Sequence, residues 1–219
     1  MVIACFIPIR SGSKRIKNKN FVKINKEPLI KHICKKIINS KLVNKFYIGS
    51  EDYKTYSKIG HQMKNFAFFK RSKKSATSMA PSEMVLQEFL KENENIDIVV
   101  FVQATNPFIK YEYIDNAIEK LIKGKYDSLL SVVKSKHFLW KNKTITSPIN
   151  YNYKKRAMSQ SINSYYVENG SFYIFYKKNF LKYKNRLHGK IGAYEMPLES
   201  VHEIDEEKDL RIVKKLLKK

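Results

Sequence analysis

A cluster of basic residues follows directly after the first apolar stretch of the chain. Residues 2–9 are mostly apolar, and the chain then turns through a Ser-Gly-Ser sequence into a lysine-rich segment. An apolar run that ends in such a turn is typical of a buried strand followed by a loop. Glycine leaves the backbone free to point N–H groups at an anion, and basic side chains neutralise its charge. We therefore predict a polyphosphate-binding loop, formed by the turn Ser11, Gly12 and Ser13 and the basic side chains of Arg10, Lys14, Arg15, Lys17 and Lys19.

The loop matches neither the Walker A sequence nor the glycine pattern of a dinucleotide site. An ordinary lysine-rich surface loop is the alternative interpretation of this segment.

Two acidic residues near the end of the chain form a second candidate site. Glu203 and Asp205 alternate in an extended Glu-Ile-Asp sequence, which places both carboxylates on one side of the backbone. Two carboxylates beside a triphosphate suit Mg²⁺. Asp205 could instead cap the helix predicted over residues 206–217, and Asp209 is interpreted as a helix-surface or capping residue.

Several motifs share a pattern with one known family. Residues 7–20 read Ile-Pro-x-Arg-x-Gly-Ser-Lys-Arg-Ile-x-x-Lys-Asn, and the sequences at 103–110, 168–175 and 203–205 follow in order. Together they resemble the acylneuraminate cytidylyltransferases, or CMP-sialic acid synthetases, whose bacterial branches activate nonulosonic acids. The resemblance implies an α/β fold, a three-layer Rossmann-like sandwich of the nucleotide-diphospho-sugar transferase type with a mostly parallel central sheet. It also implies one cytidylyltransferase domain over residues 1–219.

The resemblance also assigns roles to individual residues. Arg71 and Ser82 match family positions that enclose the cytosine and ribose, and Gln103 offers a donor and an acceptor to a sugar. The full set that it implies is Arg10, Lys14 and Lys19 as catalytic residues on the triphosphate; Ser11, Gly12, Ser13, Asn20, Arg71 and Ser82 on the nucleotide; Gln103, Thr105, Gln160 and Asn169 on the sugar acid; and Asp205 and Glu203 on Mg²⁺.

The chain departs from the family pattern at several of these motifs. Ser72 replaces a proline, Ser78 replaces an aspartate, and Lys110 replaces an arginine. The arginine expected just before Gln160, which would pair with the carboxylate of the sugar acid, is Ser159 here. Arg156, Lys154 or Lys155 could serve instead, and the identity of the sugar stays open.

The elements that must position these residues alternate along the chain. Strands are predicted over 2–9, 45–50, 66–69, 97–102 and 128–133, and helices over 28–40, 52–64, 83–92 with Ser82 as N-cap, 111–123 and 206–217. This cadence predicts a parallel sheet with right-handed crossovers, in which ligands bind beyond the carboxyl ends of the strands. Residues 134–166 lose the alternation and carry aromatic residues. The resemblance implies that this segment is a dimerisation excursion.

Composition limits the remaining possibilities. The net charge is +23, but six of the 43 basic residues are Arg and the other 37 are Lys spread along the whole chain. A nucleic-acid-binding function is therefore not favoured. Cys5 and Cys34 are interpreted as buried thiols of a reducing compartment. No signal peptide or apolar run of 18 residues is present in the sequence, so we expect a cytoplasmic protein that is not bound to a membrane.

The interpretation that joins these observations is a CTP-dependent cytidylyltransferase. The anomeric hydroxyl of a nonulosonic acid would attack the α-phosphorus of CTP, with Mg²⁺ as cofactor and a homodimer as the assembly. One alternative is the same reaction on the eight-carbon keto-deoxy sugar acid. A second is a non-catalytic basic protein of the same fold that binds a nucleotide or a nucleic acid.

Overall fold

A seven-stranded sheet forms the centre of the computed structural model, which describes residues 1–13, 15–60, 63, 65–142, 144, 146–161 and 164–218. The strand order is β11-β7-β10-β6-β1-β4-β5. Six strands run in one direction, and only β10 is antiparallel to its neighbours β6 and β7. The mostly parallel sheet is thus confirmed. The strands are β1 (Ile3–Pro8), β4 (Lys45–Ser50), β5 (Phe66–Lys70), β6 (Ile98–Val102), β7 (Ser128–Ser135), β10 (Tyr165–Tyr176) and β11 (Ile191–Glu195).

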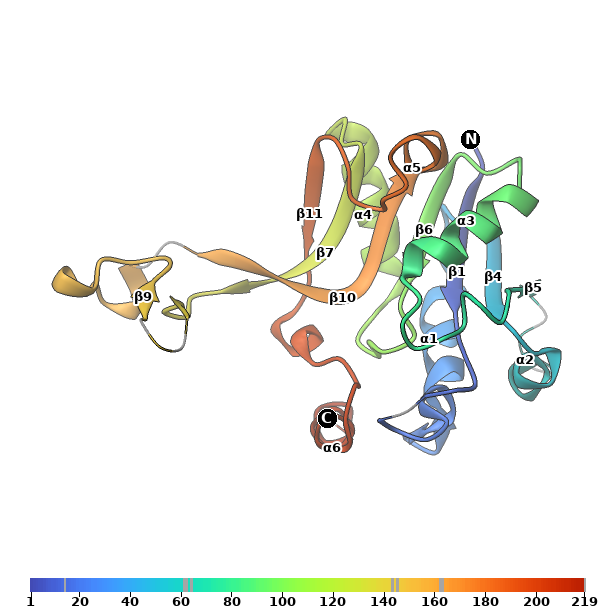
Figure 1. Ribbon diagram of the computed structural model, residues 1–219, viewed down its shortest axis with the longest axis horizontal. Coiled ribbons are helices and arrows are strands. Elements are labelled where there is room, and N and C mark those ends of the chain that lie inside the picture. Colours follow the sequence, from blue (N-terminus) through green and yellow to red (C-terminus); the bar gives the residue numbers. More distant parts are fainter. Residues whose placement is uncertain are drawn as a thin grey trace.

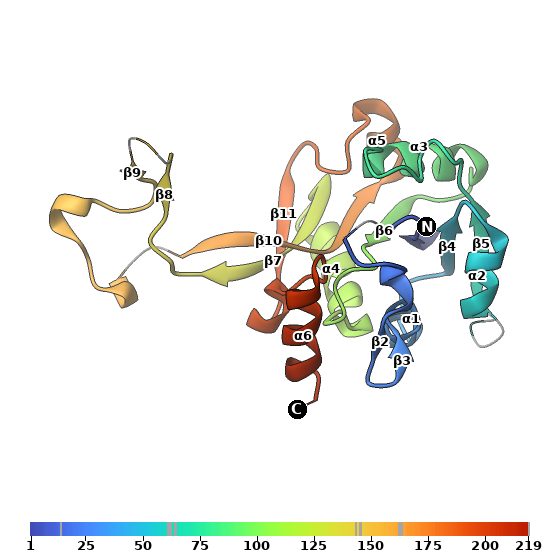
Figure 2. The same cartoon turned by 60° about the horizontal axis from the view of Figure 1, so that its bottom comes forward.

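Helices cover both faces of the sheet and complete three layers (Figure 1; Figure 2). Alternate side chains of β1 supply both cores, because Cys5 and Ile7 pack on one face and Phe6 packs on the other. The ring of Phe6 stacks on Phe89 at 4.2 Å between centroids. One face carries α1 (Leu29–Ile37), α2 (Tyr53–Gly60), α4 (Tyr111–Lys123) and α6 (Glu207–Leu216), and the other carries α3 (Ser82–Glu92) and α5 (Lys177–Tyr183).

Helix ends differ in detail from the sequence-based expectations. The helix expected over 52–64 ends at Gly60, and the one expected over 28–40 ends at Ile37. The N-cap of α3 is Pro81, so Ser82 is its first residue rather than its cap. Helix α5 was not predicted, because its sequence has only two adjacent apolar residues, Phe180 and Leu181, outside its terminal tyrosine.

The start of α6 shows that Asp205 does not cap this helix. The Oδ2 atom of Asp209 accepts hydrogen bonds from the backbone N–H groups of Asp205, at 3.1 Å, and Glu206, at 2.8 Å. Asp209 therefore caps the helix as part of a capping box with Glu206. The carboxylate of Asp205 is left to interact elsewhere.

A long excursion separates β7 from β10 and projects away from the sheet, at the left of Figure 1. It carries exposed apolar side chains, including Ile149, Tyr153 and Met158. Its short elements are β8 (Trp140–Lys141), β9 (Ser147–Pro148), η2 (Tyr153–Lys155) and η3 (Ser159–Ser161). The segment predicted at 134–166 is thus a projecting arm, and its role in dimerisation stays a prediction.

Short elements complete the chain: η1 (Lys19–Phe21), β2 (Lys23–Ile24), β3 (Glu27–Pro28) and η4 (Leu198–Val201). Among the residues that the structure describes, every helix is too short or too polar to span a bilayer.

Candidate active site

A cavity of about 420 Å³ opens beyond the carboxyl ends of β1 and β6, where a parallel sheet is expected to bind its ligand. Four separate segments of the chain contribute to its wall. They are the loop after β1, with Arg10, Ser13, Lys19 and Asn20; the 71–80 loop and the start of α3, with Arg71, Ser75, Thr77, Ser78, Ala80, Ser82 and Val85; the end of β6 and the turn after it, with Phe101, Gln103, Ala104 and Thr105; and the acidic turn, with Glu203 and Asp205.

The acidic turn is fixed to the turn after β6 through Ile204. The side chain of Ile204 is fully buried, and its N–H donates to the carbonyl of Thr105 at 2.9 Å. Because Ile204 points inward, its two acidic neighbours point to the cavity. The hydroxyl of Thr105 donates to Oε2 of Glu203 at 3.0 Å. The prediction that Glu203 and Asp205 share one side is confirmed.

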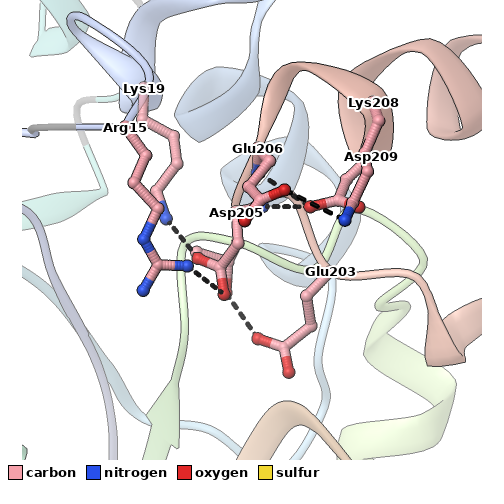
Figure 3. A network of polar contacts seen from close by, with 8 residues as sticks. Arg15, Lys19, Glu203, Asp205, Glu206, Lys208 and Asp209 are labelled. Carbon is pink, nitrogen blue, oxygen red and sulfur yellow. Dashed lines mark hydrogen bonds and ion pairs between the residues drawn. The ribbon is translucent and has the colours of Figure 1, made fainter.

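Two basic residues of the opening loop, Arg15 and Lys19, point toward Asp205 of the acidic turn (Figure 3). Lys19 Nζ donates to Asp205 Oδ1 at 2.8 Å, and Arg15 Nη1 lies 3.7 Å from Oδ2. Only 17% of the Lys19 side chain is exposed, whereas 49% of the Asp205 side chain is. These contacts bring residues almost two hundred positions apart into one site.

The two carboxylates have different environments. Burial, helped by the negative charge of Asp205, raises the pKa of the Glu203 carboxyl above its usual range. Burial also acts to raise the pKa of Asp205, but the hydrogen bond and charge of Lys19, with the charge of Arg15, hold it below its usual range. A nearby cation would therefore stabilise the ionised form of Glu203.

The donor set fits a hard divalent cation. Glu203 and Asp205 offer carboxylate oxygens, the ligands that Mg²⁺ prefers. Within the described part of the chain, no group of three or more His, Cys, Asp and Glu side chains surrounds a common point. A cation at this pair would complete its coordination with water or phosphate oxygens, as Mg²⁺ commonly does beside one or two carboxylates.

The opening loop agrees only in part with its predicted role. Asn20 is 6% exposed and its Nδ2 donates to the carbonyl of Arg10 at 3.0 Å, so it braces the loop while lining the cavity. Ser11 does not line the cavity, because its N–H and hydroxyl both donate to Glu51 Oε1, at 2.8 and 2.5 Å. Gly12 has no left-handed backbone, and a Cβ there would meet nothing within 4 Å. Lys14 lies outside the described residues.

Arg71 lines the cavity but is mainly a brace. Its side chain is buried, and Nη1 donates to the carbonyl of Ile9 at 3.2 Å. Nε donates to Ser75 Oγ at 3.3 Å, and Nη2 donates to the Ser75 carbonyl. The guanidinium thus joins the 71–80 loop to the end of β1. The sequence pattern located Arg71 at the cavity but did not show these internal partners.

Asn169 and Gln160 do not line the cavity. Asn169 is 1% exposed, its Nδ2 donates to Ser200 Oγ at 2.8 Å, and its Oδ1 accepts from Ser131 Oγ at 2.6 Å. In this structure its amide holds β7, β10 and η4 together, and this differs from the predicted contact with a substrate. Gln160 is exposed on the projecting arm. The cavity of its own chain lacks it.

Gly170 supports the acidic turn in a way that the sequence alone did not show. Its φ is +57°, and a Cβ atom there would lie 2.3 Å from Glu203 Oε1. The backbone of β10 therefore packs directly against this carboxylate. The missing side chain at Gly170 makes room for the Glu203 carboxylate.

Three comparisons with known proteins bear on this site. A family model described as "Cytidylyltransferase" matches residues 4–217. The N-acylneuraminate cytidylyltransferase A of Danio rerio is 30% identical over 93% of this chain, and the chain spans 48% of that protein's length. The pseudaminic acid cytidylyltransferase of Campylobacter jejuni is 26% identical, over 98% of this chain and 95% of its own length.

The fold has close counterparts among solved structures. A CMP:2-keto-3-deoxy-manno-octonic acid synthetase solved in complex with CTP superposes with a TM-score of 0.74, over 100% of this chain and 99% of its own. At 14% sequence identity this likeness shows the fold alone. The three-layer arrangement expected from the sequence is thereby confirmed.

Proposed function

Because the chain belongs to the cytidylyltransferase family, we propose that it transfers CMP from CTP to the anomeric hydroxyl of a sialic-acid-like nonulosonic acid, with release of pyrophosphate. The observation that carries this proposal is the single cavity that joins Arg10 and Lys19 to Glu203 and Asp205. A basic wall and an acidic wall facing each other suit a triphosphate with a bound cation.

The lining of the cavity suits the parts of the nucleotide. Arg10 and Lys19 would neutralise the phosphates. Ala80, Val85 and Phe101 are among the apolar side chains of the wall, and in this proposal the base lies against them. The α-phosphorus would then lie near the turn that carries Gln103 and Thr105.

Glu203 and Asp205 would hold Mg²⁺, which would offset the negative charge of the triphosphate when bound. The side chains themselves have a positioning role. Thr105 fixes the Glu203 carboxylate, and Lys19 lies within hydrogen-bonding distance of Asp205 and beside the proposed phosphate site. Catalysis would rest on orientation and charge, which are the main requirements of phosphoryl transfer.

The acceptor would enter on the side of Gln103 and Thr105, whose amide and hydroxyl can hydrogen-bond a sugar. In the same proposal the protein acts in the cytoplasm as a homodimer, and the projecting arm of a second copy brings Gln160 and a basic neighbour such as Arg156 to the acceptor. The exposed apolar side chains of the arm support this part of the proposal.

Calorimetric titration with CTP, UTP and ATP tests the nucleotide part of the proposal. CTP should bind at least about tenfold more tightly than UTP, because a site that hydrogen-bonds one base leaves polar groups unpaired with the other. Equal affinities for the three nucleotides would contradict it. Equally, tight salt-sensitive binding of random DNA without selective CTP binding would favour the nucleic-acid alternative.

A further inference from the structure

One carboxylate outside the cavity collects three hydrogen bonds from the 71–80 loop. Glu88 is half-buried on α3, and its Oε1 accepts from the hydroxyl of Ser72 at 2.6 Å. Its Oε2 accepts from the N–H of Ser72 at 3.1 Å and from the hydroxyl of Ser75 at 2.8 Å. Both oxygens of Glu88 are therefore used to hold this loop.

These hydrogen bonds favour the ionised form of the side chain. Burial acts to raise the pKa of the Glu88 carboxyl, but the hydrogen bonds from Ser72 and Ser75, with the charge of Arg71, hold it below its usual range. Hydrogen bonds to an ionised carboxylate are about twice as strong as those between neutral groups.

Ser75 links Glu88 to Arg71 in the cavity wall through hydrogen bonds. Its Oγ donates to Glu88 and accepts from Arg71 Nε, while Arg71 Nη1 donates to the carbonyl of Ile9. A continuous chain of hydrogen bonds thus runs from α3 through the loop to the residue before Arg10. Arg71 and Ser75 both line the cavity, whereas Glu88 does not.

The loop has few other attachments. Among the described residues, every other hydrogen bond of residues 72–80 joins two members of the loop or its junction with α3. Most of its side chains are exposed, and Met79 is 90% exposed. Without a large apolar contact, the position of the loop depends on Arg71 and Glu88.

We propose that Glu88 is a positioning residue for nucleotide binding: its carboxylate holds the 71–80 loop against the cavity, and so sets the affinity for CTP. This inference rests on the proposed function for the identity of the ligand. Ser72 is the main residue of the loop that binds Glu88, because it donates both its N–H and its hydroxyl to the Glu88 carboxylate. The proline that the resembled motif carries at this position could donate neither.

Trypsin provides a test that does not depend on activity, because the loop contains the exposed neighbours Lys73 and Lys74. In Glu88→Ala, the fragment that ends at Lys73 or Lys74 should form at least about tenfold faster than in the wild type, since three hydrogen bonds of the loop are lost. Mass spectrometry identifies the fragment. Glu92→Ala removes an exposed carboxylate from the same helix, and trypsin should cleave this control variant at the wild-type rate.

Nucleotide binding provides the second readout. Glu88→Ala should raise the Kd and the KM for CTP about tenfold, while kcat changes less, because the loop acts on binding rather than on the reacting atoms. Glu88→Gln keeps one acceptor oxygen and should restore part of the affinity. If Glu88→Ala does not fold, Ser72→Ala removes one donor from the exposed side and should show the same effects at smaller size.

The outcomes separate this inference from the proposed function. The proposed role of Glu88 would be overturned if a folded Glu88→Ala protein were cleaved at Lys73 and Lys74 no faster than the wild type. An unchanged Kd for CTP in that variant would also overturn it. If the wild type binds no CTP, the proposed function fails together with the ligand named here. The cleavage rates would still decide whether Glu88 anchors the loop.

Discussion

Asp205→Asn is expected to lower kcat/KM for CMP transfer by about a hundredfold to a thousandfold, the usual loss when one preorganised electrostatic group is removed from an active site. Asparagine keeps the size of the side chain but removes its charge. The substitution would take a ligand from the proposed cation site and the ionic partner from Lys19 and Arg15. Pyrophosphate release at varied CTP concentrations measures the effect.

Glu207→Gln is the matched control for this substitution. It also removes one negative charge, two residues away, but Glu207 is exposed at the start of α6 and does not line the cavity. Its kcat/KM should stay within about threefold of the wild type, because an exposed charge is screened by solvent. If Asp205→Asn and Glu207→Gln were equally active, Asp205 would not belong to the catalytic site.

Gly170→Ala is expected to damage both the fold and the site. A residue with a side chain costs about 1–2 kcal/mol in the left-handed backbone conformation that Gly170 adopts. In addition, the new Cβ would lie 2.3 Å from Glu203 Oε1, so the carboxylate would have to move. Urea unfolding should show the loss of stability, and the remaining folded protein should be at least about tenfold less active.

Gly189→Ala separates the two effects. Gly189 has a φ of +60°, and a Cβ there would lie 2.2 Å from Asp127 Oδ2. The backbone strain and the collision with a carboxylate in Gly189→Ala are therefore similar to those in Gly170→Ala. Asp127 and Gly189 lie outside the cavity. Gly189→Ala should therefore lose comparable stability and keep its activity per folded molecule. Equal loss of activity in the two variants would contradict a special role for Gly170.

Local patterns in the sequence were enough to predict the elements around the cavity. The apolar runs predict β1 and β6 as strands of one parallel sheet, and the structure pairs them with each other. The polar residues that follow each run come together because both strands end at the same edge of the sheet. This is why Arg10, Lys19 and Gln103 lie in one cavity. Alternation also placed Glu203 and Asp205 correctly, since Ile204 between them is buried.

Contacts between distant segments could not be predicted in this way. Nothing near Ser11 in the sequence indicates that Glu51 takes its N–H, and nothing near Asn169 indicates Ser131 and Ser200 as partners. Polar residues in motifs were therefore assigned to ligands, although the structure uses several of them as buried braces. Whether Arg71 is assigned to a ligand or to a structural role depends on its full set of hydrogen-bond partners, which only the fold provides.

The long β10 strand shows a second limit of sequence patterns. It pairs with β6 over Phe172–Tyr176 and with β7 from Tyr165 to Phe175, and its register with β7 shifts between Glu168 and Tyr173. A polar sequence with a glycine is typical of a turn, so the segment before Ser171 does not by itself predict a strand. Tertiary pairing with β7 extends the strand back to Tyr165.

The most direct test of the proposed activity is pyrophosphate release from CTP and Mg²⁺ with a panel of acceptors: N-acetylneuraminate, legionaminate, pseudaminate and the eight-carbon keto-deoxy sugar acid. We expect release with at least one nine-carbon acid and its loss in Asp205→Asn. Release with the eight-carbon acid alone would support the alternative acceptor. If folded wild-type protein releases no pyrophosphate with any of the four, the proposed transfer of CMP to these acids is wrong.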